Sequence, residues 1–207
     1  MNNNNISTII ILDWDDTLFP TSWVIKNNIN LLSKKHVDIY TKIFTKLDGA
    51  IFNLLKSLEK YGTVMLVTNA LPSWVYISAK VLPKTQSLLE NIYIYSARQL
   101  YQEYYDDMME WKKRTFEKII KKHVNSNEAV NIISIGDADY EKMALVELYN
   151  LPFLRNKKIL KTIKLMRSPT LKHLIDQLTV LNKASNYFCT SNDHIDWNFK
   201  INNKTLA

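Results

Sequence analysis

The feature that most constrains the fold is a regular alternation of short apolar runs and longer amphipathic segments along the chain. The runs have five or six residues, rich in β-branched or aromatic side chains, and lie at 8–12, 63–67, 91–95, 130–135 and 162–166. Such lengths favour buried strands over helices. Helical i, i+3, i+4 spacing marks the segments at 47–58, 76–82, 98–122, 140–149 and 171–181. This alternation of strands and helices predicts an α/β fold, with a Rossmann-like, three-layer core and a mostly parallel sheet.

Composition excludes several other classes of protein. With 207 residues and 46% apolar side chains, the chain has enough material for one sizeable domain with a hydrophobic core. Its one cysteine, Cys189, excludes a disulfide framework and a cysteine-rich zinc module. No apolar run approaches the roughly 18 residues of a membrane helix, and the asparagine-rich start does not resemble a signal peptide. We therefore expect an intracellular, cytoplasmic protein that does not enter a membrane.

The net charge of +7 is unevenly distributed along the chain. Residues 1–150 hold 17 Lys or Arg and 17 Asp or Glu, whereas 151–207 hold 10 against three. A basic end can face anionic partners such as nucleic acid. It can equally be a solvated surface of a lysine-rich composition, and charge alone does not decide between these readings.

Acidic side chains gather where the first strand should end. Asp13, Asp15 and Asp16 lie within four residues, directly after the apolar run at 8–12. Carboxylates this close repel one another unless a cation binds them. The carboxyl ends of strands are also where α/β sheets bind their ligands. An acidic turn that simply ends the strand is the alternative for this cluster.

Other predicted strand ends carry matching chemistry. The second strand ends at Thr68-Asn69, and the fourth at Gly136-Asp137, followed by Asp139 and Glu141. Between them, the segment Trp111-Lys112-Lys113-Arg114 offers a cation. Carboxylates, a hydroxyl and a cation on neighbouring strand ends favour phosphoryl transfer.

These residues resemble the haloacid dehalogenase (HAD) superfamily of phosphohydrolases, whose four motifs occur here in order. The first, DxDx[TV], is matched by Asp13, Asp15 and Thr17. Thr68 matches the second motif and Lys112 the third, with Lys113 as a competitor. The fourth, GDxxx[DE], is matched by Gly136, Asp137 and Glu141, with Asp139 as a rival to Glu141. Asp16 stands where many relatives have glycine, and it is expected to cap the turn.

The resemblance implies a Mg²⁺-dependent phosphatase that acts on a phosphomonoester through an aspartyl-phosphate intermediate. Asp13 would be the nucleophile and Asp15 the general acid and base. Thr68 and the backbone of Asn69 would hold phosphoryl oxygens, with Lys112 offsetting charge. The Asp13 side chain, the Asp15 carbonyl and the Asp137 side chain would bind Mg²⁺.

In the family, substrate choice lies in an inserted cap, and here there is space for little or none. We expect residues 1–183 to form the core, with a short helical insert at about 21–48 and a loosely packed tail at 184–207. Phe19, Pro20, Ser22 and Trp23 follow the first motif, either as a flap over the leaving group or as ordinary packing. An open site would accept a bulky or macromolecular substrate.

Two other functions fit the same sequence. The chain can be a nucleic-acid-binding module that uses its basic 151–207 region. It can also be a phosphate-binding protein on a catalytically silent fold of the same kind. Neither alternative requires the carboxylates to turn over a substrate.

Overall fold

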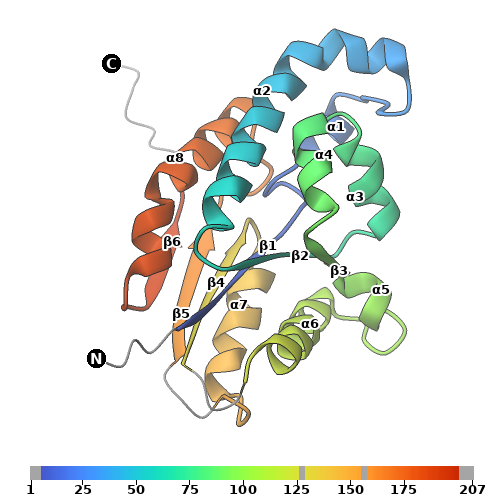
Figure 1. Ribbon diagram of the computed structural model, residues 1–207. Helices are drawn as coiled ribbons and strands as arrows, with labels where there is room; N and C mark the ends of the chain where they lie inside the picture. Colours follow the sequence, from blue (N-terminus) through green and yellow to red (C-terminus); the bar gives the residue numbers. More distant parts are fainter. Residues whose placement is uncertain (1–5, 126–128, 155–157, 201–207) are drawn as a thin grey trace.

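The computed structural model of the protein describes residues 6–125, 129–154 and 158–200 (Figure 1). A six-stranded, all-parallel sheet lies at its centre, in the order β3-β2-β1-β4-β5-β6. The strands are β1 (Ser7–Leu12), β2 (Thr63–Thr68), β3 (Tyr93–Ser96), β4 (Val130–Gly136), β5 (Lys158–Lys164) and β6 (Ile195–Asn198). The predicted α/β, Rossmann-like class is therefore confirmed.

Helices cover both faces of this sheet. They are α1 (Thr21–Lys26), α2 (Lys34–Leu58), α3 (Pro72–Ala79), α4 (Pro83–Leu89), α5 (Ala97–Tyr101), α6 (Met108–His123), α7 (Asp139–Glu147) and α8 (Leu171–Thr190), with the short 3-10 helix η1 (Leu148–Asn150). On one face α2 packs against α8, and on the other α6 packs against α7.

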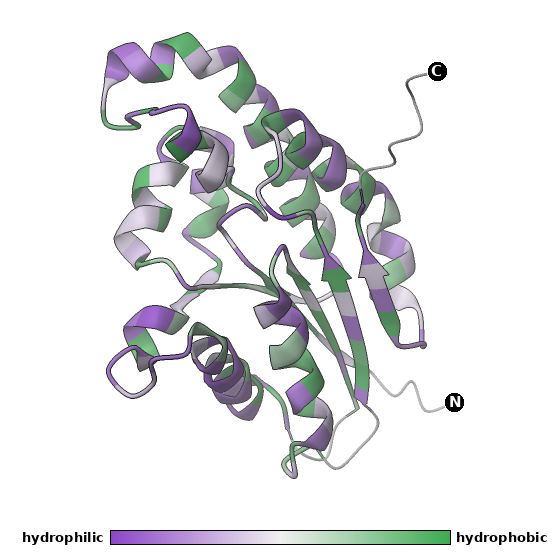
Figure 2. Ribbon diagram, turned by 180° about the vertical axis from the view of Figure 1, so that it is seen from behind, coloured by the Kyte–Doolittle hydropathy of each residue, from purple (hydrophilic) through white to green (hydrophobic). Residues whose placement is uncertain are grey.

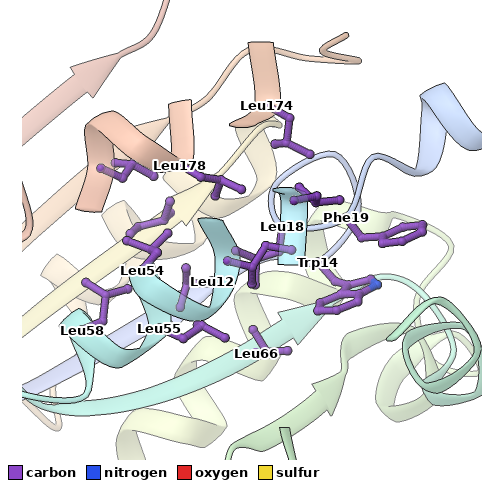
Figure 3. Packing of buried hydrophobic residues seen from close by; sticks show 14 of the residues in the cluster. Leu12, Trp14, Leu18, Phe19, Leu54, Leu55, Leu58, Leu66, Leu174 and Leu178 are labelled. Atoms are coloured by element: carbon purple, nitrogen blue, oxygen red, sulfur yellow. The ribbon is translucent and has the colours of Figure 1, made fainter. Parts of the chain in front are cut away.

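Each face has its own hydrophobic core, and β1 contributes to both. Ile10 and Leu12 pack with the leucines of α2 and α8, as Figure 3 shows around Leu12. Ile9 and Ile11 pack with apolar residues of α6 and α7. Successive side chains of a strand point to opposite faces, so a strand between two helical layers is apolar at every position. This explains why the run at 8–12 has no polar alternation.

The expected insert at 21–48 is not separated from the core. After α1, the helix α2 runs without a break from Lys34 to Leu58 and passes the expected boundary at Asp48. Asp48 itself is buried and accepts hydrogen bonds from the backbone N–H groups of Lys84 and Thr85, at 3.0 and 2.8 Å. These contacts tie the middle of α2 to the start of α4. The first half of α2 and the loop before it project beyond the carboxyl edge of the sheet (Figure 2).

The segment from residue 184 differs from the loosely packed tail that we expected. Helix α8 continues to Thr190, and β6 then adds a sixth strand beside β5. Trp197 of β6 stacks on Tyr187 with ring centroids 5.8 Å apart and meets Phe188 edge-on at 6.1 Å. The strand is only four residues long and half polar, so no apolar run marks it in the sequence. Residues 201–207 lie outside the described part of the chain.

The single helix expected at 98–122 is two helices. α5 ends at Tyr101, and α6 begins after Asp107, whose carboxylate accepts from the N–H of Met109 at 2.8 Å. An aspartate at this position satisfies an N–H group that has no partner within the helix. Lys112 lies near the start of α6 and reaches Asp13, just after the end of β1.

Candidate active site

The acidic strand ends meet at the point where the strand order reverses. β1 lies between β2 and β4, and the N–H of Asp13 donates to the carbonyl of Ile135 on β4 at 3.0 Å. Asp137 follows directly after β4. Open α/β sheets bind ligands in the crevice beyond the strands at such a reversal. The chain therefore presents Asp13 and Asp137 at the edge where a ligand of this fold would bind.

A buried lysine holds the carboxylate of Asp13. The ammonium of Lys112, on α6, lies 2.7 Å from Asp13 Oδ1 and 2.8 Å from Glu141 Oε1. It also donates to the carbonyl of Val67 at 2.6 Å, and only 1% of the side chain is exposed. The contacts with Asp13 and Val67 are hydrogen bonds, and the contact with Glu141 is an ion pair. The lysine thus joins β1, β2, α6 and α7 in one buried cluster.

Lys112, and not its neighbour, belongs to this cluster. Lys113 points to Glu110 and Glu147 at 3.3 and 3.4 Å on the outer side of α6. The sequence held a signal for this choice, because the buried residues of α6 recur with helical spacing. They are Trp111, Lys112, Thr115, Phe116, Ile119 and Ile120. Lys112 follows this apolar stripe and Lys113 does not.

Of the two acidic residues at the start of α7, Glu141 and not Asp139 belongs to the cluster. Glu141 is buried and folds back so that its carboxylate also accepts from the N–H of Ala138 at 3.2 Å. Asp139 is exposed and pairs with Lys164 and Arg167. Gly136 makes room for the fold-back, because a Cβ there would lie 2.3 Å from Cγ of Glu141. The glycine of the fourth motif is therefore required by close packing.

Carboxyl groups outnumber ammonium groups in the cluster. Burial, with the neighbouring Glu141 and Asp15, raises the pKa of Asp13 to about 8 although Lys112 opposes the shift. Burial also raises the pKa of Asp137 to about 7, with contributions from Glu141 and Asp16. For Lys112, burial alone would lower the pKa, but Asp13 and Glu141 outweigh it and raise the pKa. One ammonium is thus shared among several carboxyl groups.

Asp15 is held by donors from three elements, α1, α3 and β2. Its Oδ1 accepts from the indole N–H of Trp74 on α3 at 2.7 Å and from the hydroxyl of Thr21. Its Oδ2 lies 3.4 Å from the hydroxyl of Thr68, which is fully buried at the end of β2. Thr68 Oγ1 in turn accepts from the N–H of Ala70 at 3.0 Å. The structure thus brings Asp15 and Thr68 together, as expected.

Asn69 follows Thr68 at this edge, and its side chain contacts the start of α6. Its amide nitrogen lies 3.4 Å from the carbonyl of Met108, at the start of α6. The expected role of Asn69 uses its backbone N–H, which this side-chain contact leaves unaffected.

Asp16 and the aromatic residues after it organise the loop that follows β1. Asp16 has a φ of 52°, in the region that favours glycine and that aspartate tolerates. Its carboxylate accepts from the N–H of Ser22 at 2.9 Å and from the Ser22 hydroxyl, so it caps α1. Phe19 is fully buried between Trp14, Phe44 and Trp74 rather than placed as a flap (Figure 3).

Trp74 and Thr21 are site residues that no sequence motif predicted. Thr21 opens α1, directly before Ser22, and Trp74 lies six residues after Thr68 in the segment Leu71-Pro72-Ser73-Trp74. The proline marks a helix start close to the second strand end. That position is the only sequence signal that could have directed attention to Trp74.

The donors at the expected magnesium site are chemically suited to that ion. In the described ranges, no three His, Cys, Asp or Glu side chains converge as ligands for one metal. The set implied by the resemblance is smaller, with the carboxylates of Asp13 and Asp137 and the carbonyl of Asp15. Carboxylate and carbonyl oxygens are ligands that Mg²⁺ accepts. A cation would favour the ionised form of two carboxyl groups whose pKa values burial raises.

The basic region offers less free charge than its composition suggests. Lys161 is fully buried and donates to two carbonyls at the end of α8, each at 2.7 Å. Lys158 donates to the carbonyl of Tyr149 and lies over its ring. Lys164 pairs with Asp139. Binding of nucleic acid by this region stays a prediction, and these three lysines give it little support.

None of the helices in the described ranges is both long enough and apolar enough to cross a lipid bilayer. Comparison of the chain with protein-family models, with curated proteins and with solved structures finds no match.

Proposed function

We propose that the protein is a Mg²⁺-dependent phosphohydrolase that cleaves a phosphomonoester through an aspartyl-phosphate on Asp13. One observation carries the proposal: the Asp13 carboxylate lies at the reversal point of the sheet with a buried ammonium on one oxygen, at 2.7 Å. A lone acidic turn would not require a fully buried lysine. The order of the four sequence motifs supports the same chemistry.

In the first step, Asp13 attacks the phosphorus atom. Lys112 binds Oδ1, and we assign the attack to Oδ2. The new Oδ2–P bond forms as the bond from phosphorus to the substrate's bridging oxygen breaks. The ammonium offsets the negative charge that gathers when carboxylate and phosphoryl group approach each other.

Asp15 handles the proton in both steps. It gives a proton to the departing bridging oxygen, which leaves as an alcohol. It then takes a proton from the water that attacks phosphorus, so that phosphate leaves and the Asp13 carboxylate is restored. Thr68, 3.4 Å from Asp15, and the backbone N–H of Asn69 would hold the phosphoryl oxygens during both steps.

Mg²⁺ would be held by the side chains of Asp13 and Asp137 and the carbonyl of Asp15, and it would supply positive charge against the phosphate. Glu141 keeps Lys112 in place from the other side, at 2.8 Å. The described residues form no separate domain above this edge, which favours a bulky or macromolecular phosphomonoester over a small metabolite.

The test is hydrolysis of an aryl phosphate by the purified chain, with Mg²⁺ and with chelator. Asp13→Asn should lower kcat at least about a thousandfold, and no phosphoenzyme should be trapped from radiolabelled substrate. Asp176→Asn, on the exposed side of α8, is the matched control and should keep full activity. Urea unfolding of both variants separates lost chemistry from lost folding.

A panel of nucleotides, sugar phosphates, phosphopeptides and phosphate-ended oligonucleotides then identifies the substrate class. If the wild-type chain turns over none of these and no aryl phosphate, the proposal is wrong. Turnover that persists in Asp13→Asn would equally exclude Asp13 as the nucleophile.

A further inference from the structure

Trp74 makes a contact that has no role in the function proposed so far. Its indole N–H points to Asp15 Oδ1 at 2.7 Å, with Thr21 Oγ1 a second acceptor at 3.4 Å. An indole nitrogen can only donate a hydrogen bond. Asp15 Oδ1 must therefore accept, whatever the protonation state of the carboxyl group.

Trp74 is held in place through its ring and through its backbone carbonyl. Its ring meets Phe19 edge-on, with centroids 6.0 Å apart. Its carbonyl accepts from the buried hydroxyl of Ser78 at 2.7 Å, and Ser78 Oγ accepts from the indole of Trp14 at 2.9 Å. Trp14 stands between Asp13 and Asp15 in the chain. The loop after β1 and the helix α3 are thus joined twice, once through Ser78 and once through Asp15.

We propose that Trp74 is a positioning residue that fixes which oxygen of Asp15 transfers the proton. Oδ1 accepts from the N–H of Trp74 at 2.7 Å and from the hydroxyl of Thr21, whereas Oδ2 has one longer contact, 3.4 Å, with the hydroxyl of Thr68. A hydroxyl can accept as well as donate, so Oδ2 is the oxygen of Asp15 that can carry the proton. That oxygen faces Thr68, the residue assigned to the phosphoryl group. The proton therefore passes from Oδ2 to the bridging oxygen as the P–O bond breaks, and the attacking water returns one to Oδ2. This inference rests on the proposed function.

The test uses two substrates that differ in their need for a proton. The leaving group of an alkyl phosphate is a strongly basic alkoxide, which needs a proton as it departs. The leaving group of an aryl phosphate made from an acidic phenol is a stable phenolate, which departs without one. General acid catalysis contributes about 10²–10⁴-fold to a rate. We expect Trp74→Phe to lower kcat/KM about 10- to 100-fold for the alkyl phosphate and less than about threefold for the aryl phosphate. Radiolabelled phosphoenzyme should accumulate more slowly only from the alkyl substrate.

Two comparisons identify the cause. Trp197→Phe, a half-buried tryptophan on β6, should affect neither substrate. In an Asp15→Asn background, Trp74→Phe should cause no further loss, because residues that act through one another are not additive.

Each outcome decides between the two proposals. An active wild-type enzyme whose Trp74→Phe variant loses both substrates equally, or neither, overturns the positioning role and leaves the phosphohydrolase intact. A further loss in the Asp15→Asn background also overturns it. A wild-type chain that cleaves neither substrate overturns the phosphohydrolase, and the role of Trp74 is rejected with it.

Discussion

Replacing Lys112 by methionine tests how the buried cluster is stabilised. Methionine has a similar length and no charge, so the change keeps most of the packing. It leaves Asp13 and Glu141 facing each other without the ammonium that lies 2.7 and 2.8 Å from them. It also leaves the carbonyl of Val67 without its donor at 2.6 Å. We expect a large loss in the free energy of unfolding.

The magnitude follows from these distances. At an effective dielectric constant of about 20, each ion pair of Lys112 is worth about 6 kcal/mol. Burying the ammonium costs several kcal/mol, and that cost disappears in the variant. Asp13 can also take up a proton, since burial raises its pKa to about 8. Breaking a buried pair from one side then destabilises a protein by about 3–5 kcal/mol.

Urea unfolding at neutral pH, followed by circular dichroism, measures this loss. Lys113→Met is the matched control, because Lys113 forms longer, more exposed ion pairs that are worth at most about 1 kcal/mol. Removing the second carboxylate in Lys112→Met/Glu141→Gln should recover about 1–3 kcal/mol. If Lys112→Met and Lys113→Met destabilise the protein by the same amount, the electrostatic account of the cluster is refuted.

Two further substitutions probe packing and capping. Gly136→Ala should lower the free energy of unfolding by about 1–3 kcal/mol, because the new Cβ would lie 2.3 Å from Glu141. Gly49→Ala, in the middle of α2 with nothing within 4 Å, should raise it by about 0.5–1 kcal/mol. A loss at both sites would contradict the close approach at Gly136. Asp48→Ala should cost about 2 kcal/mol in urea unfolding, since it leaves two N–H groups of α4 without acceptors. Thr170→Ala, at the exposed cap of α8, should cost only about 0.5–1 kcal/mol, and an equal cost at both caps would show that burial adds nothing at Asp48.

Much of the fold and the site could be predicted because the signals are local. The apolar runs predicted β1 to β5, and β5 alone begins well before its run, at Lys158 rather than at 162. Parallel strands bring their carboxyl ends to one edge, so Asp13 and Asp137 were expected to be neighbours. The helical spacing of the buried residues in α6 also distinguishes Lys112, which follows it, from Lys113, which does not. In each case a few adjacent residues decide the outcome.

Other features left no local pattern. β6 has only four residues, two of them polar, and it belongs to the sheet because β5 offers an edge and Tyr187 a ring for Trp197. Lys161 reads as a free cation in the sequence but is buried beneath the end of α8. Burial of this kind depends on what a distant element places over a residue.

By itself, then, the sequence determined the α/β class and the edge of the sheet at which the carboxylates meet, because side-chain periodicity and strand direction are properties of short segments. Only the tertiary structure decided how those groups are held. Trp74 lies 59 residues from Asp15 in the chain, yet its N–H is 2.7 Å from that carboxylate. The contact exists because the packing of α3 against the loop after β1 sets the rotation of the helix, and no spacing within either segment encodes that rotation.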